Sequence, residues 1–140
     1  NIWITHKIEH ENIENITKLE QWINNVFGKY DYVSLYVQTH INPLTSNNHP
    51  GFLPKPILEK ALSDIKQSNA KTGYNLSMYI DMLNYMLNNY DDEKIFYKYR
   101  EEKALKRLKS TIMNIDKVRK QSYKVGLEPL TKEWMDSLDG

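Results

Sequence analysis

The stretch "NLSMYIDMLNYMLNNY", residues 75–90, decides the fold. Its apolar residues recur at helical spacing along one side, namely Leu76, Tyr79, Ile80, Leu83, Met86, Leu87 and Tyr90. Met78, Met82 and Tyr85 widen this apolar arc beyond half of the circumference. A helix with so little polar surface has to be covered by other elements. We therefore predict a helix over about 75–90, capped by Asn75, at the centre of the domain.

An amphipathic helix is predicted upstream, beginning near Glu11. Its inner face consists of Ile13, Ile16, Leu19, Ile23, Val26 and Phe27, and its outer face of Glu14, Lys18, Gln21 and Asn25. Glycine adopts the left-handed conformation that ends many helices. We therefore expect this helix to end at Gly28 in that conformation.

The segment 30–41 fits two structures. Val33, Leu35 and Val37 alternate as in a strand, whereas Val33, Tyr36, Val37, His40 and Ile41 match helical spacing. The β-branched and aromatic content favours a strand. However, a strand needs a partner, which only residues 1–8 could supply, and the surrounding elements are helical. We therefore predict a helix over 30–41 and leave residues 1–10 open as a short strand or an arm.

Residues 42–55 contain three prolines and one glycine, so they are predicted to form an exposed loop. Pro56 suits the first turn of a helix, where its missing N–H leaves no bond unmade. The buried face of this helix is predicted to consist of Ile57, Leu58, Ala61, Leu62 and Ile65. The helix ends at the "NAKTG" segment, residues 69–73.

The longest element is predicted over 92–122, with Asp91 or Asp92 as its cap, and spans roughly 45 Å. Its apolar residues do not share one face throughout, because Ile95, Phe96 and Tyr99 point away from the arc formed further along. That arc consists of Ala104, Leu105, Leu108, Ile112 and Ile115. The helix is therefore expected either to kink near residues 100–103 or to pack on different neighbours along its length.

Gly126 and Pro129 stop the long helix, and a short last helix starts at Thr131 as N-cap with Trp134 and Leu138 inward. The sequence therefore predicts an all-α fold, an irregular bundle of five to six helices with one long helix (about 92–122) in its C-terminal half. A chain of 140 residues fits one domain, 1–140. Because it begins with Asn1, we expect this domain to be excised from a longer polypeptide.

Composition excludes several classes of site. The chain has no cysteine, so it contains no disulfide and no thiolate nucleophile or metal ligand. An intracellular or other reducing compartment is therefore expected. No apolar run approaches the roughly 20 residues that span a bilayer, so we expect a soluble domain without a transmembrane segment. Sixteen lysines against three arginines, with fourteen asparagines, are typical of an AT-rich genome.

Charge is concentrated in residues 100–124, which carry nine basic against three acidic residues although the formal net charge is only +1. On a helical projection the predicted outward side consists of Lys103, Lys106, Arg107, Lys109, Lys117, Lys120 and Lys124. This basic helix is either the solvated side of an amphipathic helix or a surface that binds an acidic protein segment or phosphates. The remainder of the chain is acidic, so docking of the acidic C-terminal segment within the molecule is a third alternative.

A second candidate surface is the flank of the central helix formed by Met78, Met82, Tyr85 and Met86. Flexible thioethers and amphipathic tyrosines suit a groove that adapts to a partner helix. The same side chains also fit an ordinary core.

Catalytic and metal signatures are weak. His6 and His10 have the i, i+4 spacing of metal ligands on a helix, but no third ligand is evident. Asp91 to Glu93 fits the start of a helix, and Ser46 and His49 lack an acidic partner. Because there is also no P-loop and no dinucleotide-binding motif, we expect no catalysis, no metal site and no cofactor.

These observations favour a non-enzymatic helical module or scaffold for protein–protein interaction, which binds a partner segment through a groove or basic face formed by its long helices. The alternative is nonspecific binding of nucleic acid or another anionic surface by the basic face of helix 92–122. Arginine is the side chain that usually recognises guanine in DNA, and the chain has only three arginines. Sequence-specific recognition of DNA is therefore not expected. The predicted partner-binding residues are Lys103, Lys106, Arg107, Lys117, Lys120, Met78, Met82 and Tyr85.

Overall fold

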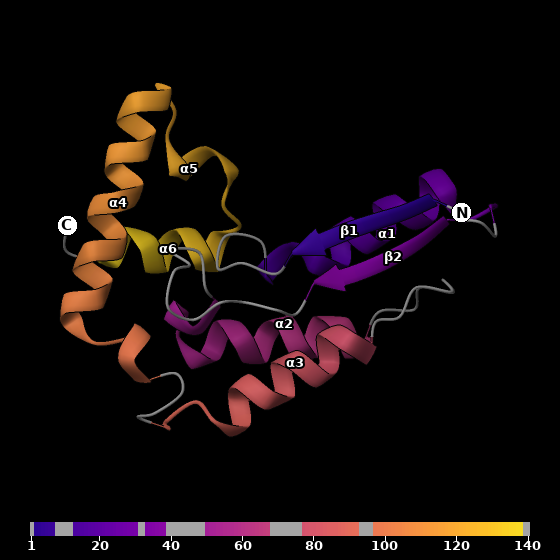
Figure 1. Cartoon of the computed structure of the whole chain (residues 1–140), viewed down its shortest axis with the longest axis horizontal. Helices are drawn as coiled ribbons and strands as arrows, with labels where there is room; N and C mark the ends of the chain where they lie inside the picture. Colours follow the sequence, from indigo (N-terminus) through magenta and orange to yellow (C-terminus); the bar gives the residue numbers. More distant parts are fainter. Residues whose placement is uncertain are drawn as a thin grey trace.

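The second and third helices, Lys55–Gln67 and Ser77–Asn88, pack side by side in antiparallel directions at the base of the molecule (Figure 1). The computed structural model describes residues 2–7, 13–30, 33–38, 50–67, 77–92 and 97–138. The helices are α1 (Ile16–Phe27), α2 (Lys55–Gln67), α3 (Ser77–Asn88), α4 (Glu102–Arg119), α5 (Tyr123–Gly126) and α6 (Pro129–Ser137). The remaining elements are the strands β1 (Ile2–Lys7) and β2 (Val33–Gln38) and the 3₁₀ turns η1 (Ile13–Asn15), η2 (Pro50–Phe52) and η3 (Tyr97–Tyr99).

The core lies around α3, as its apolar pattern predicts. Tyr79 and Leu83 of α3 are fully buried, and Met86 is nearly so. They pack against α2, whose Leu58 is also fully buried. The predicted inner face of α2 is confirmed: Ile57, Leu58, Ala61 and Ile65 are buried and Leu62 is partly buried. Pro56 lies in the first turn of α2, as expected.

The predicted first helix is present, with two corrections. Glu14, expected to face solvent, is buried, while Val26, expected in the core, is exposed. Gly28 does not adopt a left-handed conformation. Instead, a Cβ atom at this position would lie only 2.3 Å from the backbone oxygen of Asn24. Glycine is therefore required at the end of α1 by the close approach of the backbone.

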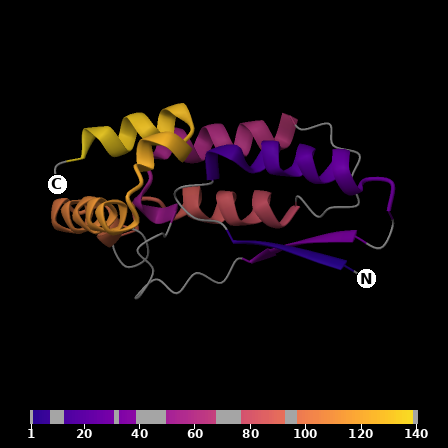
Figure 2. The same cartoon turned by 90° about the horizontal axis from the view of Figure 1, so that it is seen from above.

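The helix predicted over 30–41 is wrong, because its central residues form β2. This strand pairs in parallel with β1, with Ile2 opposite Val33 and Lys7 opposite Gln38. Residues 1–8 thus supply the partner that a strand in this position requires. The parallel pairing is possible because α1 provides the long crossover that parallel strands need. Figure 2 shows this two-stranded ribbon at the end of the molecule opposite α4.

The exposed loop predicted over 42–55 lies largely outside the described residues, and its last part is buried. Pro50, Gly51 and Phe52 form η2, and Leu53 is fully buried. The ring of Phe52 meets that of Tyr99 edge to face, with 5.1 Å between centroids. Apolar burial therefore fixes the end of this segment despite its prolines and glycine.

The longest helix is shorter than predicted, because α4 begins at Glu102 rather than near 92. Tyr99 is buried against Phe52 in η3, and the guanidinium of Arg100 lies over the ring of Tyr90 at 3.5 Å from its centroid. These contacts hold the preceding turn in a different direction from α4. The break falls at the kink near residues 100–103 that the apolar pattern allowed.

The helix α4 also ends earlier than predicted, at Arg119. Lys120 adopts the left-handed conformation, with φ at 53° and ψ at 43°, and its N–H group lies near the carbonyl oxygens of Asp116 and Lys117. The chain then reverses into α5, which is capped by the Ser122 side chain. A lysine therefore performs the C-terminal role that the sequence assigned to Gly126 and Pro129.

The last helix starts before Thr131, which is not its N-cap. Pro129 occupies the first turn of α6, and Thr131 is fully buried within it. Trp134 is only partly buried, as is Leu138, whereas Met135 is fully buried against the core. The buried carboxylate of Glu14 accepts hydrogen bonds from the N–H group and the hydroxyl of Thr131, each at 2.8 Å.

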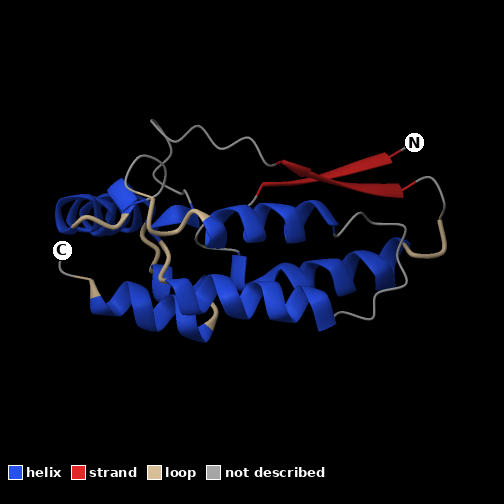
Figure 3. Ribbon diagram, turned by 90° about the horizontal axis from the view of Figure 1, so that it is seen from below, coloured by secondary structure: helices blue, strands red, loops and turns tan. Residues whose placement is uncertain are grey.

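Most of the described residues are helical, as Figure 3 shows. The predicted helical bundle is therefore confirmed, with the pair β1 and β2 added to it. Six α-helices lie within the described residues, and every buried apolar side chain described lies in a helix, a 3₁₀ turn or the residue joining η2 to α2. None of the described helices is both long enough and apolar enough to cross a membrane.

Candidate functional site

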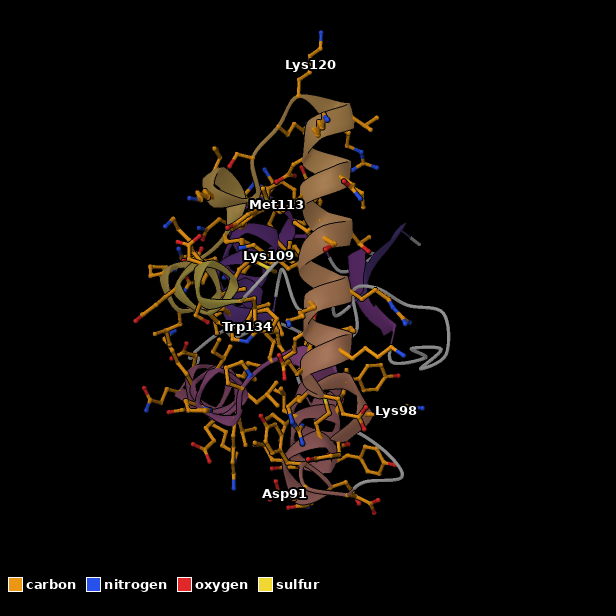
Figure 4. The ribbon with its side chains drawn as sticks, turned by 90° about the vertical axis from the view of Figure 1, so that its left-hand side faces the viewer. Asp91, Lys98, Lys109, Met113, Lys120 and Trp134 are labelled. Carbon is orange, nitrogen blue, oxygen red and sulfur yellow. The ribbon has the colours of Figure 1, made fainter. Side chains whose placement is uncertain are left out.

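The predicted basic face lies along the outer side of α4. Lys103, Lys106, Arg107 and Lys117 are exposed, and Lys120 is exposed at the end of the helix. The face extends over about 26 Å, since the helix rises 1.5 Å per residue. Figure 4 shows Lys120 at the free end of α4. The structure therefore places four of the five predicted basic residues at the exposed surface of α4, and Lys120 at the residue that ends this helix.

Most of these cations have no anionic partner among the residues that the structure describes. Lys106 forms an i, i+4 ion pair with Glu102 at 3.0 Å. Within the described part of the chain, Lys103, Arg107, Lys117 and Lys120 have no acceptor within hydrogen-bonding or ion-pairing distance. An exposed pair such as Lys106–Glu102 contributes little to stability. Lys103, Arg107, Lys117 and Lys120 can therefore bind an external anion without losing a contact with the described residues, whereas Lys106 is paired with Glu102.

The prediction that Lys109 lies on the outward side of the helix is wrong. Its side chain is buried, with 8% of its surface exposed, and points toward α5 and α6 (Figure 4). The ammonium donates to the backbone oxygen of Met135 at 2.7 Å and to the hydroxyl of Tyr123 at 2.8 Å. It also lies 4.7 Å from the centroid of the Tyr123 ring. One cation of the basic stretch is thus part of the internal structure.

These contacts continue as a chain of polar groups across α5 and α6. The hydroxyl of Tyr123 donates to Asp136 at 2.8 Å, and the second oxygen of Asp136 accepts from Lys132 at 2.7 Å. The hydrogen bonds from Lys132 and Tyr123 lower the pKa of Asp136. Burial, followed by the bond to Asp136, raises the pKa of Tyr123. At neutral pH the aspartate is therefore charged and the tyrosine is neutral, so this chain links the helices without an activated nucleophile.

The two ends of α6 are held by buried groups of opposite charge. The carboxylate of Glu14 lies at the N-terminus, where it accepts from Leu130 and Thr131. The ammonium of Lys109 lies at the C-terminal turn, on the carbonyl oxygen of Met135. Both charges have the sign that the helix dipole favours at their end. This arrangement fixes α6 against α4 and η1.

A cleft of about 870 Å³ opens beside these contacts, between the distal half of α4, the turn that follows it, α5 and α6. Lys109 and Met113 line its α4 side, Tyr123 and Lys124 its α5 side, and Asp136 its α6 side. Figure 4 shows Met113 and Lys109 on the side of α4 that faces α5 and α6. Met113, Tyr123 and Asp136 are not among the predicted site residues.

Exposed apolar side chains border this region. Met113 is 50% exposed, Val118 is 82% exposed and Val125 is 88% exposed. Monomeric proteins expose single apolar residues routinely, so each alone carries no meaning. Their position within thirteen residues that also contain Lys117, Lys120 and Lys124 makes the distal end of α4 and α5 both cationic and apolar.

Comparison of the chain with protein-family models, with curated proteins and with solved structures finds no match. The function therefore has to be argued from the residues and their geometry.

The Met and Tyr flank predicted on α3 lies apart from the cleft. Met82 is partly buried against the core and Tyr85 is exposed, while the side chain of Met78 lies outside the described residues. The cleft is bounded by α4, α5 and α6, and α3 runs along the base of the molecule (Figure 1). The structure does not bring the two sets of predicted residues into one site.

The weak metal signature gains no support. His6 lies in the extended strand β1 rather than in a helix, and His10, Ser46 and His49 lie outside the described residues. Among the residues that the structure describes, no three histidine, aspartate or glutamate side chains are grouped to hold a metal ion. Asp91 and Asp92 are exposed and precede η3 instead of capping α4.

Proposed function

We propose that the domain is a non-enzymatic interaction module that binds an acidic segment of a protein partner through the basic face of α4. Charge complementarity supports the acidic partner, because four of the five cations on this face have no acceptor in the described part of the chain. Such charges steer association and choose between partners. Because these cations remain at the surface, they keep much of their hydration when they pair with an acidic segment, so the desolvation cost is small.

The observation that favours a protein partner is the mixture of exposed valines and lysines at the distal end of α4. Val118 and Val125 are exposed by more than four fifths, beside Lys117 and Lys124. A phosphate backbone gains nothing from a valine side chain, whereas an amphipathic protein segment can cover it. The proposed partner segment is therefore acidic on one side and apolar on another.

Nonspecific binding of nucleic acid is the second candidate, and the length of the basic face favours it. Cations spread along about 26 Å of helix can follow a series of phosphates. Two features weigh against it. The exposed valines remain uncovered in such a complex, and no described aromatic side chain lies on this face to stack on bases.

The test is a pull-down with mass spectrometry that compares three proteins: the wild type, a variant with Lys103, Lys106 and Arg107 changed to Glu, and a matched control. The control changes Lys29, Lys55 and Lys66 to Glu, which gives the same net charge with substitutions outside α4. We expect the control to retain the partner and the α4 variant to lose it, in nuclease-treated lysate.

Two results contradict the proposal. Retention of the same partner by the α4 variant shows that the basic face is only solvated. Loss of all captured protein after nuclease treatment, together with binding that weakens steeply with salt, shows that the ligand is nucleic acid. Circular dichroism of both variants controls for folding.

A further inference from the structure

We propose that the cleft between α4 and α5 binds an acidic side chain of the partner segment, and that this carboxylate makes the main contact of the complex. The inference rests on the proposed function and adds the place and the chemistry of its main contact. It predicts that the partner carries an aspartate or glutamate next to an apolar residue.

The charges that line the cleft leave a net positive potential in it. Asp116 accepts a hydrogen bond from the N–H group of Tyr123 at 2.7 Å, and Asp136 is bonded to Tyr123 and Lys132. Both carboxylates are therefore already engaged. Lys117, from α4, lines the same cleft and has no acceptor within the described residues.

Lys124 stands on the α5 side of the cleft. Its ammonium lies 3.9 Å from Asp136, at the limit of an ion pair. This weak contact with a carboxylate that has two shorter hydrogen bonds leaves Lys124 able to bind a further anion. Lys117 and Lys124 thus present cations from two different elements to the same space, which suits a carboxylate entering between α4 and α5.

Lys109 provides a third, buried cation that lines the cleft. An ammonium carries three N–H donors. Two of those on Lys109 are used by Met135 and Tyr123, the acceptors found for it in the described part of the chain. Because the side chain is more than nine tenths buried, its charge is screened less than a surface charge. A carboxylate in the cleft therefore gains from Lys109 as well as from the two exposed lysines.

The apolar neighbour in the partner is inferred from Met113. This side chain lines the cleft and is half exposed. A thioether side chain adapts to apolar groups of different shape. A segment that places a carboxylate beside a leucine or a similar residue fills the cleft better than an isolated anion does.

The test uses synthetic peptides as probes and the whole 140-residue chain as receptor. One probe is an amphipathic helical peptide of about 18 residues with Glu and Leu at i, i+4 spacing. The matched probe has Gln in place of every Glu, and a phosphate-bearing control is single-stranded oligothymidylate. Binding is measured by fluorescence anisotropy at low salt, and the site is located by amide chemical shifts.

The expected result is binding of the Glu peptide, with shifts at Met113, Lys117 and Lys124, and no measurable binding of the Gln peptide. Changing Lys117 and Lys124 to Gln weakens binding about tenfold or more, since each removes a close charge contact. Met113→Glu, at a half-exposed position, weakens it similarly by placing a negative charge at the cleft. The matched control, Lys55 and Lys66 changed to Gln, alters affinity less than about twofold.

Three results overturn the inference. The Glu peptide fails to bind, or the two cleft variants bind it as the wild type does, or oligothymidylate competes for the same cleft residues. If the cleft variants bind normally while changing Lys103 and Arg107 to Gln abolishes binding, the cleft is excluded but the basic face of α4 retains its proposed function. If neither the cleft variants nor the change of Lys103 and Arg107 to Gln weakens binding of the Glu peptide, both proposals are contradicted.

Discussion

Substitution of Glu14 tests the main long-range polar contact of the fold. Glu14 lies in η1, and 7% of its surface is exposed. Its carboxylate accepts from the N–H group of Leu130 at 3.3 Å, and from the N–H group and hydroxyl of Thr131 at 2.8 Å each. The N-cap residue of α6, Glu128, makes no capping bond with its own side chain. Glu14 therefore replaces the missing cap from 114 residues earlier in the chain.

The expected cost of Glu14→Ala is about 3 kcal/mol of the free energy of unfolding. Loss of a cap alone costs about 0.5–2 kcal/mol. A buried donor left without a partner costs about 1–3 kcal/mol, and Thr131, which is fully buried, loses the acceptor for two donors. The cavity left by the side chain adds to this loss. Glu14→Gln keeps one acceptor oxygen, so about half of the effect is expected.

Urea denaturation followed by circular dichroism measures these differences. The matched control is Glu59→Ala, because Glu59 is an exposed glutamate on α2. We expect the control to change the free energy of unfolding by less than about 0.5 kcal/mol. A loss of less than 0.5 kcal/mol for Glu14→Ala, on the order of the control, would refute the reasoning that Glu14 holds α6 in place.

Three further predictions concern other parts of the fold. Lys109→Met should destabilise the domain by about 2 kcal/mol in the same assay, because a charged donor to Met135 is lost; an unchanged midpoint would contradict its role. Gly28→Ala should cost about 1–3 kcal/mol through the 2.3 Å approach to Asn24, whereas Gly126→Ala, with no atom within 4 Å, should not destabilise. Burial raises the pKa of Tyr99 to about 12, so its share of the stability is complete below about pH 10 and is lost as pH rises toward 12. Alkaline unfolding of Tyr99→Phe should accordingly depend less on pH.

Helical periodicity predicted the elements whose packing is decided by one apolar face. The pattern in residues 75–90 identified α3 as central, and Tyr79 and Leu83 are fully buried. The basic face of α4 was predicted for the same reason, since its cations lie opposite Leu108 and Ile112. In both cases a projection of the sequence onto a helix contains the necessary information.

The strand β2 could not be predicted in this way, because its stability depends on a segment 31 positions earlier in the chain. Its sequence matches both periods, so propensity alone did not decide between them. The β-branched residues favour a strand, whereas the helical surroundings favour a helix. The pairing of β2 with β1, within residues 1–8, decides between the two.

Glu14 and Lys109 were both assigned to solvent-facing sides, because a helical projection treats every charged residue as exposed. Their burial depends on unpaired backbone groups at the ends of α6, which the projection of another helix does not contain. A signal existed for Glu14, since α6 starts with Glu128 and Pro129 and lacks a serine, threonine or asparagine at its N-cap. A helix without its own cap requires an acceptor from elsewhere.

The position of each lysine relative to α6 decides whether its charge is internal or available. Lys109 lies where α4 passes the C-terminal turn of α6, so its ammonium is used by the carbonyl oxygen of Met135. Lys117 and Lys120 lie two to three turns further along, where α4 has passed α6 and only α5 is beside it (Figure 1). The contact at Lys109 anchors α4, and the helix then carries the later cations and Val118 into solvent as a rigid extension. A surface on a regular helix loses less conformational entropy on binding than one on a loop, because its backbone is already fixed. In the proposed complex, the buried lysine therefore contributes to binding at the distal end by holding in place the helix that presents the binding residues.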